Sequence, residues 1–367
     1  MIAVLVQQLR AQGVQVELFT VRDSTTRSHK KHWLYQHGQY SDIQKPYYDS
    51  APIIVSHIAA ALNAIREDAT FDVIHDHNPY IGPAMMAYAD ESYPPIVHTL
   101  HGPPFSAPDQ LALGVPDNLP MWRQLGKLSR VHYINISKAA DKATPSQLRH
   151  SVLRPAYNGI DVSAVPFVEK KSDYFMTLAR FHPNKGQHLA IKACRASGDR
   201  LKMAGLVGNI AVPKQLMMEL ANPMSPYRSL IDFKYFSDKI FPEIDDTQIS
   251  YVGDLAEKPK YRMLGRAKAL LFPIQWEEPF GMAVIEALAA GTPVVAMARG
   301  AMPELIQHGY NGFLAHDFKE FQHYMQHVAD ISPTHCRQSV EEKFSAGMMA
   351  KQYIERYKEV MAKSAKA

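Results

Sequence analysis

The sequence contains very little cysteine and no long apolar run. Cys194 and Cys336 lie far apart and outside any Cys-x-x-Cys spacing, which excludes a disulfide framework and a thiolate zinc site within one chain. The longest weakly charged stretch, residues 279–298, contains Glu286 and a Gly-Thr-Pro break, so it is too interrupted to span a bilayer. No signal-peptide pattern opens the chain. These absences predict a cytoplasmic protein, either free or peripheral at the inner membrane face.

Charged residues are also few. They make up 21% of the 367 residues, against 46% hydrophobic and 10% aromatic residues, so disorder, collagen and coiled coil are excluded. The net charge of +4 is mild and forms no concentrated basic stripe, which does not favour nucleic acid as a partner. The length suggests about two domains.

The first half alternates between helical and strand patterns. Residues 2–13 have the apolar spacing of an amphipathic helix, and apolar residues alternate with polar ones over residues 14–20. Residues 22–50 have no clear period and predict a long loop. The further elements predicted in this half are a helix over 52–66, strands over 71–75, 95–101 and 133–137, and a helical patch over 83–90. This order predicts a parallel sheet.

The polar segment 163–172 is the predicted linker to a second domain with the same alternation. Its predicted strands are 174–179, 201–207, 249–253, 269–273 and 293–297, and its predicted helices are 187–195, 259–266 and 280–290. Residues 211–226, rich in Met and Pro, indicate an inserted excursion. The sequence therefore predicts two doubly wound α/β domains.

The strongest local signal is Glu278-Pro-Phe-Gly-Met-Ala-Val-Ile-Glu286, in which seven residues separate two carboxylates. The segment follows a predicted strand and crosses the start of a predicted helix. Unpaired N–H groups and the helix dipole favour an anionic or hydroxyl-rich ligand there, and Gly281 lets such a ligand approach the backbone. The alternative is that Glu278 caps the helix and Glu286 is a solvated helix carboxylate.

A second signal follows the strand over 174–179, where Arg180 and Lys185 precede a predicted helix. Ligand crevices in open α/β sheets lie at the carboxyl ends of strands. An Arg fork and a Lys point charge beside a helix N-terminus suit a diphosphate. The alternative is two ordinary exposed cations.

Together these segments resemble the family 4 retaining glycosyltransferases (glycosyltransferase group 1). The similar stretches are VHTLHG (97–102), YNGIDV (157–162), LARFHPNKG (178–186), YVGDL (251–255), WEEPFGMAVIEALAAGTPVVA (276–296) and ELIQHGYNGFL (304–314). They cover most of the chain, and the Glu-x7-Glu segment followed by EALAAGTPVVA is a highly specific combination. The resemblance implies an α/β fold of the GT-B type, in which two facing Rossmann-like domains hold a nucleotide sugar in the cleft between them.

The resemblance also implies roles for individual residues. Arg180 and Lys185 match the pair that holds the donor diphosphate and stabilises the charge on the leaving group. Glu278 matches the carboxylate that faces the donor sugar, and His101 matches a histidine of the first domain near the transferred sugar. A structural histidine at a strand end is the alternative for His101. Two kinds of substrate-binding position are implied. Glu286 matches the carboxylate that binds the ribose hydroxyls. The backbone N–H groups that hold sugar hydroxyls would come from Phe280, Gly281 and Met282.

The predicted reaction needs neither metal nor cofactor. No Asp-x-Asp occurs in the sequence, so Arg180 and Lys185 would replace the cation that such a pair holds against the diphosphate. In a retaining transfer through an oxocarbenium-like state, the leaving phosphate oxygen can accept the proton of the acceptor, and no protein base is required. The predicted partners are a sugar donor of the UDP, GDP or ADP type and an unidentified acceptor.

The domain boundaries expected from the resemblance are 1–165 for an acceptor-side domain, 166–343 for the nucleotide-sugar domain and 344–367 for a helix that returns to the first domain. In the family, a central strand and a glycine-rich loop open the first domain, whereas Met1 begins inside the helix that follows them. We therefore expect a gap or free edge beside residues 14–20, and less transfer than in a version extended by about 15 to 25 residues.

Several alternatives remain open at this stage. A metal cluster is one interpretation of His75, His77, His98 and His101. The basic, aromatic stretch 27–40 could bind an acceptor or an anionic membrane, or could be a solvated loop. The cations over 258–268 predict a solvated helix face. The alternative functions are a nucleotide-sugar epimerase or phosphorylase of this fold, and a catalytically silent sugar-nucleotide-binding protein.

Overall fold

A computed structural model describes residues 1–39, 42, 47–68, 70–102, 105, 117–128, 130–210 and 212–364 of the chain. The chain divides into two compact units. Unit 1 comprises residues 1–159 and the segment from 346 onward, and unit 2 comprises residues 160–345. The contacts thus place the boundary at 159/160, where the sequence suggested 165/166. We describe each unit separately.

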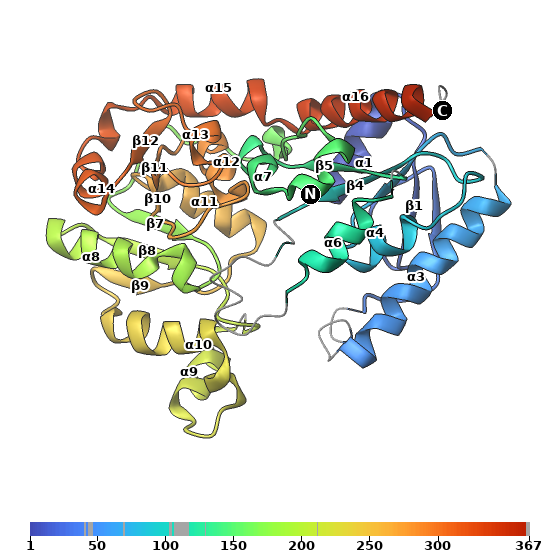
Figure 1. The fold of residues 1–367 in the computed structure, drawn as a ribbon. Helices are drawn as coiled ribbons and strands as arrows, with labels where there is room; N and C mark the ends of the chain where they lie inside the picture. Colours follow the sequence, from blue (N-terminus) through green and yellow to red (C-terminus); the bar gives the residue numbers. More distant parts are fainter. Residues whose placement is uncertain are drawn as a thin grey trace. The chain divides into compact units, whose positions relative to one another are not determined.

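Unit 1 is built on a four-stranded parallel sheet of order β3-β4-β5-β6 (Figure 1). The strands are β3 (Ile74–Asp76), β4 (Ile96–Leu100), β5 (Val131–Asn135) and β6 (Val152–Leu153). Every residue of β4 is buried, as expected of a central strand covered on both faces. The predicted strands over 71–75, 95–101 and 133–137 are therefore present with narrower or shifted bounds.

The strand predicted over 14–20 lies outside this sheet. In the described residues, β1 (Glu17–Thr20) pairs only with β2 (Lys30–Trp33), in parallel, and the four-stranded sheet ends at β3. Within the described part of the chain, the second edge of β1 has no strand partner, as expected. The prediction of a long loop over 22–50 was wrong in two places, because β2 lies inside it and α3 (Tyr47–Glu67) begins before its end. Residues 40, 41 and 43–46 of that stretch lie outside the described part.

Helices cover both faces of the unit 1 sheet. They are α1 (Ile2–Ala11), α3, α4 (Ile81–Met86), α6 (Leu119–Leu125), α7 (Lys138–Ala143) and α16 (Ala346–Ser364). Side chains of α1, including Leu5 and Leu9, share one apolar core with Tyr353 and Val360 of α16. The prediction that the C-terminal helix packs on the first domain is thus confirmed for residues up to 364; residues 365–367 lie outside the described part.

Unit 2 has a six-stranded parallel sheet of order β12-β11-β10-β7-β8-β9 (Figure 1). The strands are β7 (Phe175–Leu178), β8 (Leu201–Ala204), β9 (Ile249–Tyr251), β10 (Leu270–Phe272), β11 (Val294–Met297) and β12 (Gly312–Ala315). From β7 the chain builds outward through β8 to β9, and then returns to β10 and builds outward through β11 to β12. The strand order therefore reverses between β7 and β10.

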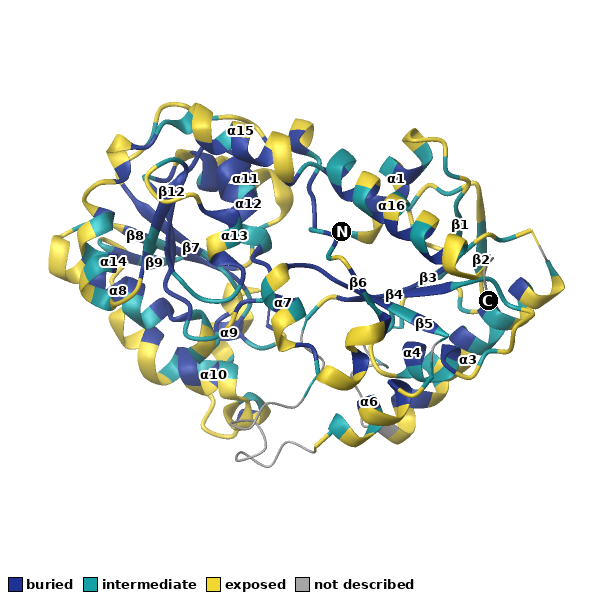
Figure 2. Ribbon diagram, turned by 45° about the horizontal axis from the view of Figure 1, so that its top comes forward, coloured by how far each residue is buried: buried dark blue, intermediate teal, exposed yellow. Residues whose placement is uncertain are grey.

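Helices of unit 2 connect these strands. They are α8 (Gln187–Ser197), α9 (Pro213–Ala221), α10 (Ile231–Tyr235), α11 (Glu257–Arg266), α12 (Met282–Ala289), α13 (Met302–Leu305), α14 (Phe318–Met325) and α15 (Pro333–Lys343). The buried sides of α8 and α12 are visible in Figure 2. The predicted excursion contains α9; residue 211, where it begins, lies outside the described part. Among the described helices, none combines the length and apolarity needed to cross a membrane.

Candidate functional site

Two loops meet at the point where the strand order of unit 2 reverses. The loop after β7 carries Arg180 and Lys185, and the loop after the neighbouring β10 carries Glu278. A direct hydrogen bond joins them, because the Gln275 N–H donates to the Asn184 carbonyl at 2.7 Å. Ligands of open parallel sheets bind at the carboxyl ends of the strands beside such a reversal. The chain's own topology therefore places these two loops where a ligand crevice is expected.

Close backbone packing at this junction requires glycine at position 186. Gly186 has φ +69°, and a Cβ there would lie 2.0 Å from the carbonyl oxygen of Pro273 at the end of β10. The left-handed conformation and the absent side chain together let η3 (Pro183–Lys185) approach the end of the next strand. This approach brings Lys185 within reach of the second loop.

The Lys185 ammonium donates to Glu278 Oε2 at 2.6 Å. The Trp276 indole N–H donates to the same oxygen at 2.9 Å, and Lys185 Nζ lies 5.0 Å from the centre of the indole ring. Both charged side chains are largely buried, with exposed fractions of 15% for Lys185 and 9% for Glu278. The contacts on Oε2 leave Oε1 of Glu278 with no protein partner among the described residues.

The Glu278 backbone is itself fixed by the segment that leads into α13. The Ala301 N–H donates to the Glu278 carbonyl at 2.8 Å, and the Gly300 N–H donates to a Glu277 carboxylate oxygen at 2.6 Å. Gly300 has φ +56°, and a Cβ there would lie 2.2 Å from the Glu278 carbonyl oxygen. The loop then enters α12 through Gly281, which has φ +102°. The first-turn N–H groups of α12, which have no partner inside the helix, open beside this loop.

Glu286 lies one turn into α12 and pairs with a cation that the sequence interpretation missed. Lys260 of α11 donates to Glu286 Oε1 at 2.7 Å, and both side chains are largely buried. The prediction that Lys260 belongs to a solvated helix face was therefore wrong. The sequence of α11 (Glu257–Arg266) does not show that Lys260 pairs with Glu286, because this ion pair depends on α11 packing beside α12.

The other predicted residues of unit 2 have different surroundings. The Arg180 side chain is 61% exposed, and its guanidinium lies 3.9 Å from the Asp232 carboxylate of α10 rather than on the Lys185–Glu278 pair. Phe280 is buried with its ring 6.1 Å from that of Phe344, and Met282 is half-buried at the start of α12. The Phe280 side chain thus belongs to the core of unit 2 and does not face a ligand.

His101 belongs to unit 1 and follows β4. Its Nε2 is 2.9 Å from Nδ1 of His77, which follows β3, and the two rings are stacked. Desolvation, followed by the charges of neighbouring imidazoles, lowers the pKa of His77 to about 3. Desolvation and the charge of His98 also lower the pKa of His101, although this residue is exposed to solvent. Both rings are therefore neutral at pH 7.

The two remaining histidines of the suggested metal cluster have protein partners. His98 Nδ1 lies 2.6 Å from the Asp76 carboxylate, and both side chains are buried. His75 lies between Tyr357 and Thr99, with 2.7 Å to each hydroxyl. Within the described part of the chain, no group of three or more His, Cys, Asp or Glu has the arrangement needed to hold a metal ion.

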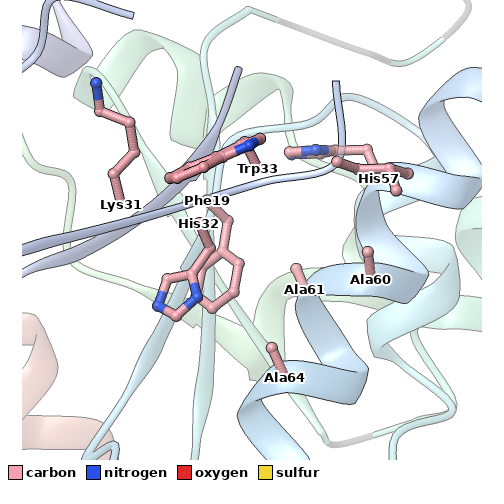
Figure 3. Close-up of a pocket in the computed structure, with 9 residues that line it drawn as sticks. Phe19, Lys31, His32, Trp33, His57, Ala60, Ala61 and Ala64 are labelled. Atoms are coloured by element: carbon pink, nitrogen blue, oxygen red, sulfur yellow. The ribbon is translucent and has the colours of Figure 1, made fainter. Parts of the chain in front are cut away.

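A cavity of about 320 Å³ lies elsewhere in unit 1, between β2 and α3 (Figure 3). It is lined by residues of the basic, aromatic stretch and by one side of α3: Phe19, Lys31, His32, Trp33, Leu34, His57, Ala60, Ala61 and Ala64. Phe19 and His32 stack with 4.4 Å between their ring centres, and the Trp33 side chain is about half exposed. Within the stretch 27–40, residues 30–33 form β2 and residues 31–34 line the cavity, whereas residues 27–29 and 34–39 have no regular structure and several of them are exposed, as expected of a solvated loop. Tyr40 lies outside the described residues.

Two family models match the chain. The model described as "Glycosyltransferase Family 4" matches residues 1–164, and the model described as "Glycosyl transferases group 1" matches residues 245–337. The two matched regions fall on units 1 and 2, respectively, and together they span more than half of the sequence.

Curated relatives match at low identity. D-inositol 3-phosphate glycosyltransferase of Mycobacterium sp. (strain KMS) is 24% identical over 322 residues, which cover 83% of this chain and 70% of the relative. Spore coat protein SA of Bacillus subtilis (strain 168) is 30% identical over 83 residues, which cover 23% of this chain and only 22% of that protein.

Solved structures share the fold. The Anabaena protein Alr3699/HepE in complex with UDP and glucose matches with a TM-score of 0.66 at 17% identity and covers 96% of this chain and 95% of that one. Sucrose-phosphate synthase from Thermosynechococcus elongatus matches with a TM-score of 0.66, also at 17% identity, over 98% and 92% of the two chains. At these identities the likeness concerns the fold alone, which is that of two Rossmann-like units.

Proposed function

We propose that this chain, which belongs to the family 4 and group 1 glycosyltransferases, transfers a sugar from a nucleoside-diphosphate donor to an acceptor with retention at the anomeric carbon. The family supplies the reaction class, and the site in unit 2 supplies the argument for the donor. That argument rests on two ion pairs of unit 2, Lys185 with Glu278 and Lys260 with Glu286.

The observation that carries the proposal is that each carboxylate accepts hydrogen bonds from the protein through only one of its two oxygens. Glu278 Oε2 accepts from Lys185 and Trp276, and Glu286 Oε1 accepts from Lys260. Among the described residues, Glu278 Oε1 and Glu286 Oε2 have no protein partner. A carboxylate that is fixed by a cation and has one oxygen left is suited to accept hydrogen bonds from hydroxyl groups. Two such groups, one before α12 and one inside its first turns, fit the sugar and the ribose of a nucleotide sugar.

The diphosphate would lie between these hydroxyl-binding positions. Lys185 supplies a point charge in a largely buried place, and Arg180 supplies an exposed guanidinium from the same loop. The start of α12, where the Val284 N–H already donates to the Gly281 carbonyl, adds the positive end of the helix dipole. These groups stabilise the negative charge that develops on the leaving diphosphate, and they do so without a metal ion.

The proposed reaction breaks the bond between the anomeric carbon and the phosphate oxygen and forms a bond from the same carbon to an acceptor oxygen. The acceptor hydroxyl loses its proton to the departing phosphate oxygen on the same face of the sugar, which accounts for retention. Glu278 faces the sugar as a hydrogen-bond acceptor. No protein group needs to serve as the base.

The decisive experiment is a transfer and hydrolysis assay on the full chain with UDP-, GDP- and ADP-sugars, with and without EDTA. UDP-glucose is the first donor to test, since UDP and glucose are bound to the Anabaena neighbour. We expect release of nucleoside diphosphate that EDTA leaves unchanged, and a product with the anomeric configuration of the donor by proton NMR. An inverted product or dependence on a divalent cation would contradict the corresponding part of the proposal.

Matched variants separate an enzyme from a silent binding protein. Lys185→Ala should abolish most donor turnover, whereas Lys192→Ala, which removes an exposed cation of the following helix α8, should leave it unchanged. Tight nucleotide binding with no turnover of any donor would favour the silent binding protein. Conversion of the donor to its sugar epimer would favour the epimerase.

We also propose the cytoplasm as the place of action. Cys194 and Cys336 are both free and buried, and burial raises the pKa of the Cys336 thiol to about 12, which keeps it protonated. Free thiols fit a reducing compartment. Peripheral contact with the inner membrane face remains part of this proposal through the exposed Trp33 and Leu34 beside the cavity of unit 1.

A further inference from the structure

Trp276 lies in the loop after β10 and has no role in the reaction described so far. Its indole N–H donates to Glu278 Oε2 at 2.9 Å, and the same oxygen accepts from the Lys185 ammonium at 2.6 Å. An indole has a single N–H donor and no acceptor. The one polar atom of the Trp276 side chain is therefore bonded to a carboxylate of the candidate site. All three residues belong to unit 2.

The backbone on both sides of Trp276 is held in place. The Gln275 N–H donates to the Asn184 carbonyl at 2.7 Å, and the Gly300 N–H donates to a Glu277 carboxylate oxygen at 2.6 Å. The Trp276 side chain is half-buried, and its ring has only two side-chain torsions to order. The indole N–H thus approaches Glu278 from a position that the folded loop already determines.

The two groups that donate to Glu278 Oε2 differ in how a bound diphosphate would affect them. The Lys185 ammonium has three N–H groups and a full charge, so a phosphate competes with Glu278 for it. The indole N–H is neutral and single. A largely buried carboxylate that loses a hydrogen-bond donor is destabilised. Trp276 supplies a donor that remains on Oε2 when the ammonium turns towards a phosphate.

We propose that Trp276 is a positioning residue, which acts through Glu278: its indole N–H holds Oε2, and Oε1 of the same planar carboxylate is thereby kept directed at a hydroxyl of the transferred sugar. The inference rests on the proposed function for the presence of that sugar. The bond between Trp276 and Glu278 does not depend on that function, because it is present without a ligand.

Two substitutions at position 276 test this role. Trp276→Phe keeps an aromatic ring and removes the N–H group. Trp276→His keeps a five-membered ring, whose Nε2 corresponds to the indole nitrogen and can carry a proton. We expect kcat for transfer to fall about tenfold in Trp276→Phe and to recover in part in Trp276→His. The Kd of UDP, GDP or ADP, whichever the unaltered chain binds, should stay nearly constant in both, because Lys185 and Glu286 are intact.

Tyr324→Phe is the matched control. It also removes a single polar group from an aromatic ring of unit 2, but this ring belongs to α14, which packs beside the edge strand β12. The substitution should alter neither kcat nor the Kd of the nucleoside diphosphate.

Proton NMR of the indole N–H groups tests the contact without any reaction. The chain has three tryptophans, so the Trp276 signal is the one missing from both variants at that position. We expect this signal far downfield, as for an N–H that donates to a carboxylate. Glu278→Ala should move it upfield, whereas Lys185→Ala should leave it downfield, because the bond from the indole to Oε2 does not require the ammonium. Near-ultraviolet circular dichroism verifies folding, and Trp276→His alone identifies the signal if Trp276→Phe does not fold.

The possible outcomes separate the two proposals. Unchanged kcat in Trp276→Phe would overturn the role of Trp276, and so would equal losses of kcat and of nucleotide affinity, because a general disturbance of the site would then be responsible. An indole signal that does not respond to Glu278→Ala would also overturn it. If the unaltered chain transfers no sugar from any donor, the proposed function fails, and the NMR result still decides whether Trp276 holds Glu278.

Discussion

Acidification between pH 7 and pH 5 should destabilise unit 1 through His75 and His77, two half-buried histidines at the carboxyl end of β3. Burial lowers the pKa of His75 well below 6.5, and it lowers that of His77 to about 3. In the unfolded chain both rings have ordinary pKa values near 6.5. As the pH falls through that value, the unfolded state binds protons that the folded state cannot bind. The free energy of unfolding therefore decreases from about pH 6.5 downward, and for His77 the decrease continues to about pH 3.

The size of the effect follows from proton binding. At pH 5 an unfolded histidine is almost fully protonated, and a ring that stays neutral in the folded state costs roughly 1 to 2 kcal/mol of stability relative to pH 7. His77 should thus cost roughly 1 to 2 kcal/mol, and His75, whose pKa is lowered in the same direction, adds to this loss. This loss is a large share of the free energy of unfolding of a typical domain, which is about 5 to 15 kcal/mol. We expect a value of about this size for unit 1.

Tryptophan fluorescence can follow unit 1 alone. Of the three tryptophans, Trp276 lies in unit 2, and in a Trp276→Phe background the main buried reporter is Trp122, which is 1% exposed in the core of unit 1. Urea unfolding at pH 7 and pH 5 then gives the loss of stability. Adding His77→Phe should reduce that loss by roughly 1 to 2 kcal/mol, whereas His37→Gln should leave it unchanged. An equal loss with and without His77 would refute the reasoning.

Three further predictions concern unit 2. Lys185→Ala should weaken binding of the nucleoside diphosphate by about 1.5 to 3 kcal/mol in calorimetry, and it should also lower unit 2 stability because Glu278 is left largely buried without its cation. Glu286→Gln should weaken nucleotide binding to a similar extent, and an unchanged Kd for either variant would count against that residue. Gly186→Ala should lower the urea midpoint of unit 2 more than Gly198→Ala, since both have positive φ but only at Gly186 would a Cβ meet backbone within 4 Å; equal effects would contradict the close packing of the two loops.

Most of the sheet strands could be predicted because burial on both faces leaves a simple pattern. In β4 and β11 every residue is buried, so each strand is a short apolar run between turn residues. The strand β2 was not predicted, because it is not buried on both faces. Its sequence Lys-Lys-His-Trp has no apolar run, and its two outer residues are exposed. It pairs only with β1 in the described part of the chain, so no core selects an apolar pattern there.

The residues of the candidate site were visible in sequence, whereas their partners were not. Lys185 and Glu278 each stand after a predicted strand, but 93 residues separate them along the chain. Their contact depends on β10 returning to the side of β7, which is a property of strand order and not of either segment. The Lys260–Glu286 pair likewise depends on how α11 and α12 pack. A long-range partner leaves no local pattern, and for this reason Lys260 resembled any other surface cation.

The ion pair at Lys185 has a consequence for how a donor would bind. A free lysine side chain loses up to about 2 kcal/mol of conformational entropy when it is ordered on a ligand. Here the Glu278 carboxylate and the Trp276 ring already hold the ammonium in one place, so part of that loss occurs on folding. In the proposed complex, the donor diphosphate would meet a cation that is ordered in advance and shared with a carboxylate. If Glu278 Oε1 accepts from a sugar hydroxyl as proposed, the charge on the phosphate and the position of the sugar would be coupled through Glu278, whose backbone is fixed by Gly300 and Ala301.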